Sequence, residues 1–404
     1  MIIVPLGVAS ATPTVTRHLS STALWREGSV YLFDCGENTQ MRMLQGGLKR
    51  SQINCIFLSH FDTDHYSGLI GLLSTLQLQR RNKPLTLVGP SGLQEYVEWN
   101  FNFAKVELHF EINYVELEEG FEEERVVDEE EFYVEARPLN HSRFCIGYRF
   151  QEKDRPGKVD AQKAQEQGIS EDWHYKDLKD GKDVELDDGT VVKSMDIVGH
   201  PRPGDSFAYV TDTRYCPNAV KLAKNTNILI HEATFTDSLS DKAEETGHST
   251  AKIAARVANE AKTKLLVITH FSARYNNEYV LLREARDDFF PAWIATELRP
   301  IFTDPAHEKG IIERRTYLKE IDSDNGKSKK KRKKRKTKRR VRKRKKVEKN
   351  KSDRSSGKRR KRIKKKDDKP SNDSNNNNNG NNGDDQPQPK PLTPRTPFDD
   401  FDRF

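Results

Sequence analysis

Cysteine is scarce in this chain, and long apolar segments are missing. The four cysteines, Cys35, Cys55, Cys145 and Cys216, are far apart and form no Cys-x-x-Cys pair. This spacing argues against a disulfide framework and favours a reducing, cytoplasmic compartment. No apolar stretch approaches the roughly 18 residues of a membrane helix. The N-terminus lacks a basic region and a long apolar stretch, so we expect neither a membrane segment nor a signal peptide.

Large apolar side chains are also nearly absent from residues 321–404, which therefore cannot bury a core. This tail has 32 Lys+Arg and 12 Asp+Glu, which gives it a net charge of +20. Because the whole chain has a net charge of +8, residues 1–320 have a net charge of −12. Its block Lys327–Lys369 holds 29 Lys+Arg. We expect a disordered basic tail that binds RNA or other polyanions; in a nucleated cell the block would also serve nuclear import, and a solubilising tail is the alternative.

Residues 1–320 mix apolar runs, turn formers and charges as a globular α/β domain does. Short runs rich in β-branched and aromatic residues predict strands. Helical spacing predicts a helix over about 249–262, capped by Ser249 or Thr250, and another after Ser67. The strands are expected at Ser29–Phe33, Ile53–Leu58, Leu85–Val88, Glu131–Glu135, Ser206–Val210, Asn227–Ile230 and Lys264–Ile268.

The stretch 151–203 differs from its surroundings because it is polar and rich in turn formers, with a weakly helical middle at Ala161–Gln167. We interpret it as a protruding arm inserted in the domain, with little core of its own.

The strongest chemical signal is the segment Phe57-Leu-Ser-His60-Phe-Asp62-Thr-Asp64-His65-Tyr-Ser-Gly68. A buried strand ends here, and within six residues the chain offers two imidazoles and two carboxylates. Such donors, closely spaced on rigid backbone, suit two divalent cations. The alternative is a polar loop that matches by chance.

Further His and Asp residues at the ends of other predicted strands argue against a chance match. His141 follows the strand Glu131–Glu135 and an expected turn at Pro138, Asp212 follows Ser206–Val210, and His270 follows Lys264–Ile268. His248 precedes the helix near 249, where it serves either in catalysis or only as a neighbour of the helix cap. Active-site residues commonly lie where the strands of a rigid sheet end.

This series resembles the ligand series of the metallo-β-lactamase superfamily, and the flanking residues resemble the ribonuclease Z family. The resemblance covers about residues 1–305, and the tail has no counterpart. Its marks are Thr16-Arg17-His18-Leu-Ser-Ser21, Leu32-Phe-Asp-Cys-Gly-Glu37, Pro138-Leu-Asn-His141, Gly247-His-Ser-Thr250 and Thr269-His-Phe-Ser-Ala-Arg-Tyr275.

The resemblance implies a dinuclear site of two divalent metal ions, with zinc as the expected metal. A water between the ions would lose a proton toward Asp64 and attack phosphorus, and His248 would protonate or stabilise the leaving oxygen, with Glu232 able to orient it. One ion would be held by His60, Asp62, His141 and Asp212, and the other by Asp64, His65, Asp212 and His270.

Two features depart from the family pattern. Asp62 stands where the family has His, and its harder, anionic donor leaves manganese or iron open as the metal. The arm reads Gly168-Ile-Ser-Glu-Asp-Trp-His-Tyr175 where the family usually has a Gly-Pro element, which puts its grip on tRNA in doubt.

We therefore predict an αββα sandwich that spans residues 1–320, with the arm at 151–203 and the tail at 321–404. The implied activity is endonucleolytic cleavage of precursor tRNA that leaves a 3′-hydroxyl on the tRNA and a 5′-phosphate on the trailer. The resemblance also implies a homodimer. The alternatives are another metal-dependent phosphodiesterase or RNase of this fold, and a metal-poor RNA-binding protein.

Overall fold

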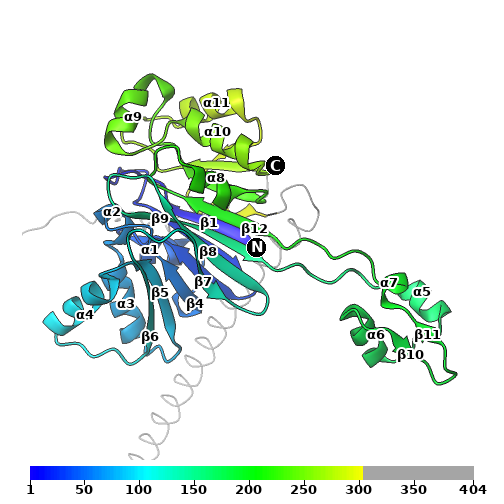
Figure 1. The fold of residues 1–404 in the computed structure, drawn as a ribbon. Helices are drawn as coiled ribbons and strands as arrows, with labels where there is room; N and C mark the ends of the chain where they lie inside the picture. Colours follow the sequence, from blue (N-terminus) through cyan, green and yellow to red (C-terminus); the bar gives the residue numbers. More distant parts are fainter. Residues whose placement is uncertain (304–404) are drawn as a thin grey trace, which may run out of the picture. The chain divides into compact units, whose positions relative to one another are not determined.

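The computed structural model describes residues 1–303 and shows two seven-stranded sheets (Figure 1). In the order in which they pair, the first sheet contains β16 (Ile301–Phe302), β1 (Ile2–Gly7), β2 (Ser21–Arg26), β3 (Ser29–Phe33), β4 (Ile53–Phe57), β5 (Leu85–Pro90) and β6 (Ile112–Leu117). The second contains β15 (Ala292–Ile294), β14 (Leu266–Thr269), β13 (Ile228–Glu232), β12 (Ser206–Val210), β9 (Cys145–Glu152), β8 (Phe132–Leu139) and β7 (Glu124–Asp128).

Aromatic side chains fill the space between the two sheets. The ring of Phe33 stacks on that of Phe57 with centroids 4.9 Å apart, and it meets the ring of Phe207 from the second sheet edge-on at 5.1 Å. Tyr148, also from the second sheet, is fully buried and packs against Phe57. Strands β3 and β12 are buried along nearly their whole length, because one face of each packs in this shared core and the other lies under helices.

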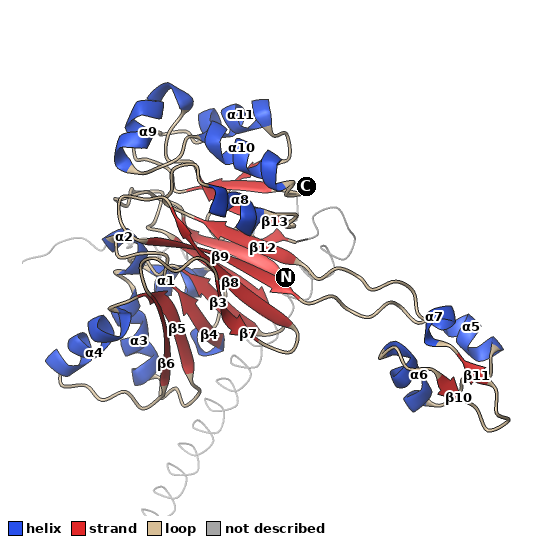
Figure 2. Cartoon of the chain, viewed as in Figure 1, coloured by secondary structure: helices blue, strands red, loops and turns tan. Residues whose placement is uncertain are grey.

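Helices cover the outer faces of both sheets, so the layers form an αββα sandwich (Figure 2). This confirms the predicted fold class. The helices are α1 (Thr39–Gln45), η1 (Arg50–Gln52), α2 (Thr63–Tyr66), α3 (Leu69–Leu78) and α4 (Leu93–Phe103) in the first half, and α8 (Pro217–Ala223), η2 (Asp237–Leu239), α9 (Ser240–Thr246), α10 (Ala251–Ala261) and α11 (Tyr279–Asp288) in the second.

Strand direction brings the predicted site residues to one edge. Strands β12, β13, β14 and β15 are parallel, and β8 runs the same way because both β8 and β12 are antiparallel to β9. In the first sheet β3, β4, β5 and β6 are parallel as well. The carboxyl ends of parallel strands lie at the same edge of a sheet, which is where open α/β sheets place ligands.

The expected turn at Pro138 is wrong, because β8 continues through it to Leu139. Strand β7 pairs with β8 only as far as Ala136, so Pro138 needs no N–H on that side. On the other side lies β9, whose Ile146 faces Pro138 in the register. The N–H of Ile146 donates to the carbonyl of Ser59 rather than to Pro138.

The arm has more internal structure than its sequence predicts. Figure 1 shows that one segment leads into it from β9 and another leads from it to β12. It contains α5 (Ala161–Glu166), α6 (Asp172–Lys179), the hairpin β10 (Val184–Glu185) and β11 (Val191–Val192), and α7 (Ser194–Ile197). The expectation of little core is wrong, because six apolar side chains are buried together: Ala164, Ile169, Leu178, Val184, Val192 and Ile197.

No helix among residues 1–303 combines the length and apolar character needed to cross a membrane. All four cysteines are buried and free. The predicted domain boundary at residue 320 and the predicted disorder of the tail fall outside the described residues.

Candidate metal centre

Seven polar side chains from separate parts of the chain converge at the shared strand edge. His60 follows β4, His141 follows β8, Asp212 follows β12 and His270 follows β14, as the sequence predicts. Asp62 is the N-cap residue of α2, and Asp64 and His65 lie within this short helix. These residues form overlapping groups whose potential ligand atoms lie within 4.8 Å of one another, and within the described region these groups include every predicted ligand.

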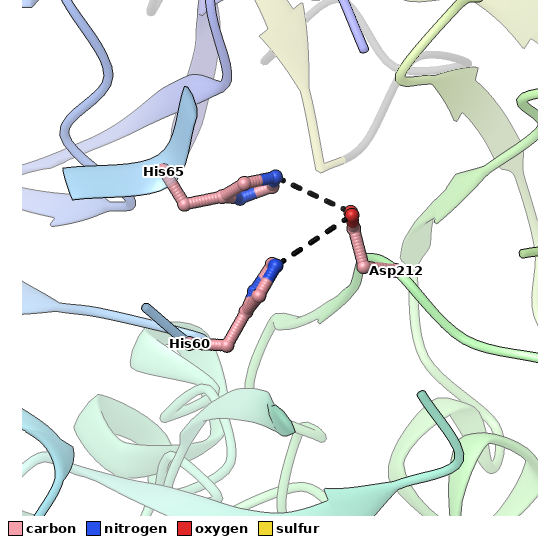
Figure 3. Close-up of side chains that lie close together, drawn as sticks. All are labelled: His60, His65 and Asp212. Carbon is pink, nitrogen blue, oxygen red and sulfur yellow. Dashed lines mark ion pairs between the residues drawn. The ribbon is translucent and has the colours of Figure 1, made fainter. Parts of the chain in front are cut away.

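The carboxylate of Asp212 faces the imidazoles of His60 and His65 (Figure 3). Its Oδ2 is 3.7 Å from Nε2 of His60, and its Oδ1 is 3.4 Å from Nε2 of His65. Oδ1 is also 3.2 Å from Nε2 of His270. The two carboxylate oxygens of Asp212 therefore face different imidazoles.

Each of the four imidazoles around the centre has its Nδ1 in contact with a neighbouring oxygen. The contacts are to Ser59 Oγ at 2.9 Å for His60, to Asp34 Oδ2 at 2.7 Å for His65, to the Gly247 carbonyl at 2.8 Å for His141, and to Thr234 Oγ1 at 3.0 Å for His270. Such outer hydrogen bonds fix the ring orientation and leave Nε2 to ligate a metal. Nε2 of His60 is buried and has no hydrogen-bond partner in the described structure, as expected for a ligand atom.

The carboxylates are held ionised. Burial raises the pKa of Asp64, but hydrogen bonds from His270 and His65 keep this pKa well below its usual range. The nearby imidazoles of His141 and His60 likewise lower the pKa of Asp62. Ionised carboxylates and imidazole Nε2 atoms form the donor set that borderline-hard divalent cations prefer, so these residues fit divalent metal ions.

Strained backbone positions two of these side chains. The φ angles of Asp212 and His270 are 39° and 61°, in the left-handed region that non-glycine residues seldom adopt. Such conformations persist where the surrounding structure enforces them, which is common at active sites.

Gly247 gives the backbone beside His141 a conformation that other residues seldom adopt. Its φ is 82°, and a Cβ there would lie 2.7 Å from Nδ1 of His141. The residue must therefore be glycine for its carbonyl to accept the hydrogen bond that orients His141.

His248 faces the centre from the turn before α10. The side chain of Thr250 caps that helix by accepting from the N–H of Ile253, and this fixes the approach of the preceding residues. Nδ1 of His248 lies 3.0 Å from Oε1 of the buried Glu232 and 3.9 Å from Oδ2 of Asp212. Burial lowers the pKa of His248, but the charge of Glu232 and the hydrogen bond to it raise the pKa to about 9.

The sequence did not single out Asp34, which supports the centre from behind. It follows β3, is fully buried, and contacts Nδ1 of His65. It also accepts from the N–H of Ser59 and the hydroxyl of Tyr209. Its position directly after a buried strand is the same signal that identified Asp212 and His270, and could have revealed it.

Comparison with known proteins supports this architecture. Residues 1–143 match the family model described as Anti-Pycsar protein Apyc1, and residues 190–271 match the model described as Beta-lactamase superfamily domain. The Ribonuclease Z of Salinibacter ruber is 43% identical over 308 residues, which cover 76% of this chain and 96% of that protein. The Ribonuclease Z of a Bacillus cereus strain is 38% identical over 299 residues, with 73% and 96% covered.

Two solved structures are similar in fold. Human tRNase Z, short form (ELAC1), superposes with a TM-score of 0.56 at 28% identity, covering 75% of this chain and 99% of that one. The metallo-β-lactamase fold protein YhfI from Bacillus subtilis superposes with a TM-score of 0.52 at 17% identity, covering 74% and 98%.

Proposed function

Because the chain belongs to the ribonuclease Z family, we propose that the converging His and Asp side chains form the catalytic centre with which it cleaves precursor tRNA. The chain is a metal-dependent endoribonuclease of precursor tRNA 3′ processing. The observation that carries the assignment of the centre is the meeting of His60, His65 and His270 at Asp212, with Nε2 of each imidazole turned toward its carboxylate.

The proposed ligands fall into two sets that share Asp212. When bound, two divalent cations would lower the pKa of a water molecule and stabilise the charge that develops at phosphorus. Zinc suits the imidazoles, and the carboxylate of Asp62 leaves manganese or iron as alternatives. The first proposed set is His60, Asp62 and His141 and the second is Asp64, His65 and His270, and the potential ligand atoms of each trio lie within 4.8 Å of one another. Asp212, whose potential ligand atoms group with those of His60 and His65, is the proposed ligand that both sets share.

Asp64 is the proposed proton acceptor. Its Oδ2 accepts a hydrogen bond of 2.7 Å from the backbone N–H of Ala11 and faces Nε2 of His65 and His270 at 3.4 and 3.5 Å. With Oδ2 fixed in this way, Oδ1 takes the proton from the attacking water as the new O–P bond forms.

His248 is the proposed general acid. Glu232 holds its Nδ1 and raises its pKa to about 9, so the imidazolium predominates at neutral pH. The proton on Nε2 passes to the leaving O3′ of the tRNA as the P–O3′ bond breaks. The products are a tRNA with a 3′-hydroxyl and a trailer with a 5′-phosphate.

The test of this proposal is cleavage of a precursor tRNA by the full-length chain before and after chelation of metal. We expect chelation to abolish cleavage and added zinc or manganese to restore it. Undiminished cleavage after chelation, with metal analysis showing an empty protein, would contradict a metal-dependent reaction.

Asp62 has a measurable role if it is a ligand. Asp62→Ala should lower the metal content of the purified protein, whereas Asp62→His should keep it and shift the preference toward zinc, because imidazole is the softer donor. Metal analysis after dialysis measures both effects. Equal metal content in wild type and Asp62→Ala would show that Asp62 is not a ligand.

We further propose that the basic tail attracts the RNA. Residues 1–320 carry −12 and residues 321–404 carry +20, so deletion of 321–404 should raise KM while kcat changes little. The slope of log affinity against log salt should flatten by roughly 0.7–0.9 of a unit for each RNA phosphate that the tail no longer neutralises. The measurement is a salt titration of precursor tRNA binding by the full chain and by residues 1–320; parallel lines would show that the tail does not bind the substrate.

The remaining parts of the proposal are a homodimer, in which the arm of one subunit holds tRNA for the other, and a cytoplasmic location, or a nuclear one in a nucleated cell. The buried core of the arm supports its use as a rigid clamp. The free, buried cysteines are compatible with a reducing compartment.

A further inference from the structure

Arg143 is an exposed residue with one close ionic contact at the metal centre. It lies in the loop between β8 and β9, two residues after His141. Its side chain is 67% exposed, yet its Nε lies 2.7 Å from Oδ1 of Asp62. A positive charge this close attracts the carboxylate and opposes its rotation away from the guanidinium.

The other oxygen of Asp62 faces the opposite way, into the centre. Oδ2 lies 3.4 Å from Nε2 of His141 and 3.5 Å from Nε2 of His60. The two oxygens of this carboxylate therefore have different neighbours. Oδ1 lies against the guanidinium, and Oδ2 lies among the atoms of the first proposed ligand set.

This orientation is not the one that the local backbone favours. Asp62 occupies the N-cap position of α2, where an aspartate side chain usually accepts from the exposed N–H groups of the first turn. Here the side chain makes no capping hydrogen bond. Asp62 is also 33% exposed, so packing alone leaves it room to turn. The ion pair with Arg143 opposes a rotation toward the helix end.

Arg143 also changes the charge at this position. With Asp62 and Asp212, the first ligand set contains two anionic donors, whereas His60 and His141 are neutral when they ligate. The positive charge of the guanidinium offsets the negative charge of the carboxylate, so Asp62 and Arg143 together carry no net charge. The pair thus supplies an oxygen donor with the net charge of an imidazole.

We propose that Arg143 is a positioning residue that holds Asp62 as a metal ligand, and that the two residues act as one neutral donor unit. The inference rests on the ligand role proposed above for Asp62. Outer groups that orient ligands commonly contribute about 10–100-fold to metal affinity. Arg143 should therefore affect the metal through Asp62 alone.

The experiment is a double-mutant cycle in the full-length chain, with zinc and manganese affinities measured by titration of the chelated protein. In the wild-type background Arg143→Ala should weaken the binding of one ion by about tenfold. In the Asp62→His background the same substitution should cause no loss, because imidazole needs no guanidinium partner. Arg143→Lys should restore part of the affinity in the wild-type background, since lysine keeps the charge but not the planar guanidinium geometry.

Arg125→Ala is the matched control. Arg125 is also exposed and lies 2.9 Å from a carboxylate oxygen, that of Asp128, which belongs to none of the candidate ligand groups. Its removal should leave both metal affinities unchanged.

Two results would overturn the proposal. Equal losses of affinity from Arg143→Ala in the two backgrounds would show that Arg143 acts independently of Asp62. Unchanged metal affinity with a raised KM for precursor tRNA would make it a substrate-binding residue instead. Asp62→Ala separates this failure from that of the ligand assignment: if it lowers metal content and Arg143→Ala does not, only the positioning role is wrong.

Discussion

Asp64→Ala is expected to lower kcat for precursor tRNA cleavage by at least about a thousandfold, because an essential group of a dinuclear site is lost. The substitution removes both a proposed ligand of the second ion and the proposed proton acceptor. Binding of precursor tRNA should change by less than about twofold, since that surface extends far beyond one carboxylate. Single-turnover cleavage and equilibrium binding under the same conditions measure the two quantities.

Asp64→Asn is the matched variant. Its side-chain oxygen can still accept from the N–H of Ala11, so the local structure should survive. The amide is a poor proton acceptor and a weaker ligand, so the loss of kcat should be similar to that in Asp64→Ala. Cleavage within about tenfold of wild type in either variant would contradict the assigned role, given what an essential metal-site base contributes.

His248→Ala is expected to lower kcat by about 100–1000-fold, the usual contribution of a general acid. The effect should depend on the leaving group. A precursor tRNA with sulfur in place of the bridging O3′ at the cleavage site releases a thiolate, which leaves without protonation. On this substrate His248→Ala should approach wild-type activity, while Asp64→Ala should remain inactive. The comparison separates proton donation from a structural role at the helix cap.

Equal losses on the oxygen and sulfur substrates would show that His248 does not protonate the leaving group. The imidazole would then support the site only through its hydrogen bond with Glu232, which also accepts from the N–H of Thr213 and the hydroxyl of Thr234.

The sequence predicted the strands that position the site because their apolar runs end at the residues that carry the chemistry. Ser29–Phe33 and Ser206–Val210 agree with β3 and β12 to the residue. Helix α10 begins after Thr250, one of the two expected caps. All seven predicted ligands lie in the groups that the structure brings together.

What the sequence did not predict depends on interactions between distant residues. Ile169 and Val192 are 23 positions apart in the arm, with no regular period between the apolar residues, so their shared core could not be foreseen. The pairing of Arg143 with Asp62 joins two separate segments of the chain and is defined only by folding. The extension of β8 through Pro138 depends on where its neighbour β7 stops.

The most direct test of the central claim is the chemistry of the ends that the enzyme produces. A precursor tRNA with a 3′ trailer is incubated with the full-length chain and divalent metal, and both products are sequenced and tested for terminal phosphate. If the centre activates water against phosphorus with O3′ as the leaving group, a single cut should give a tRNA with a 3′-hydroxyl and a trailer with a 5′-phosphate, and Asp64→Asn should give neither. A tRNA that carries a 3′-phosphate or a 2′,3′-cyclic phosphate, or cutting that continues in the Asp64→Asn variant, would contradict the account.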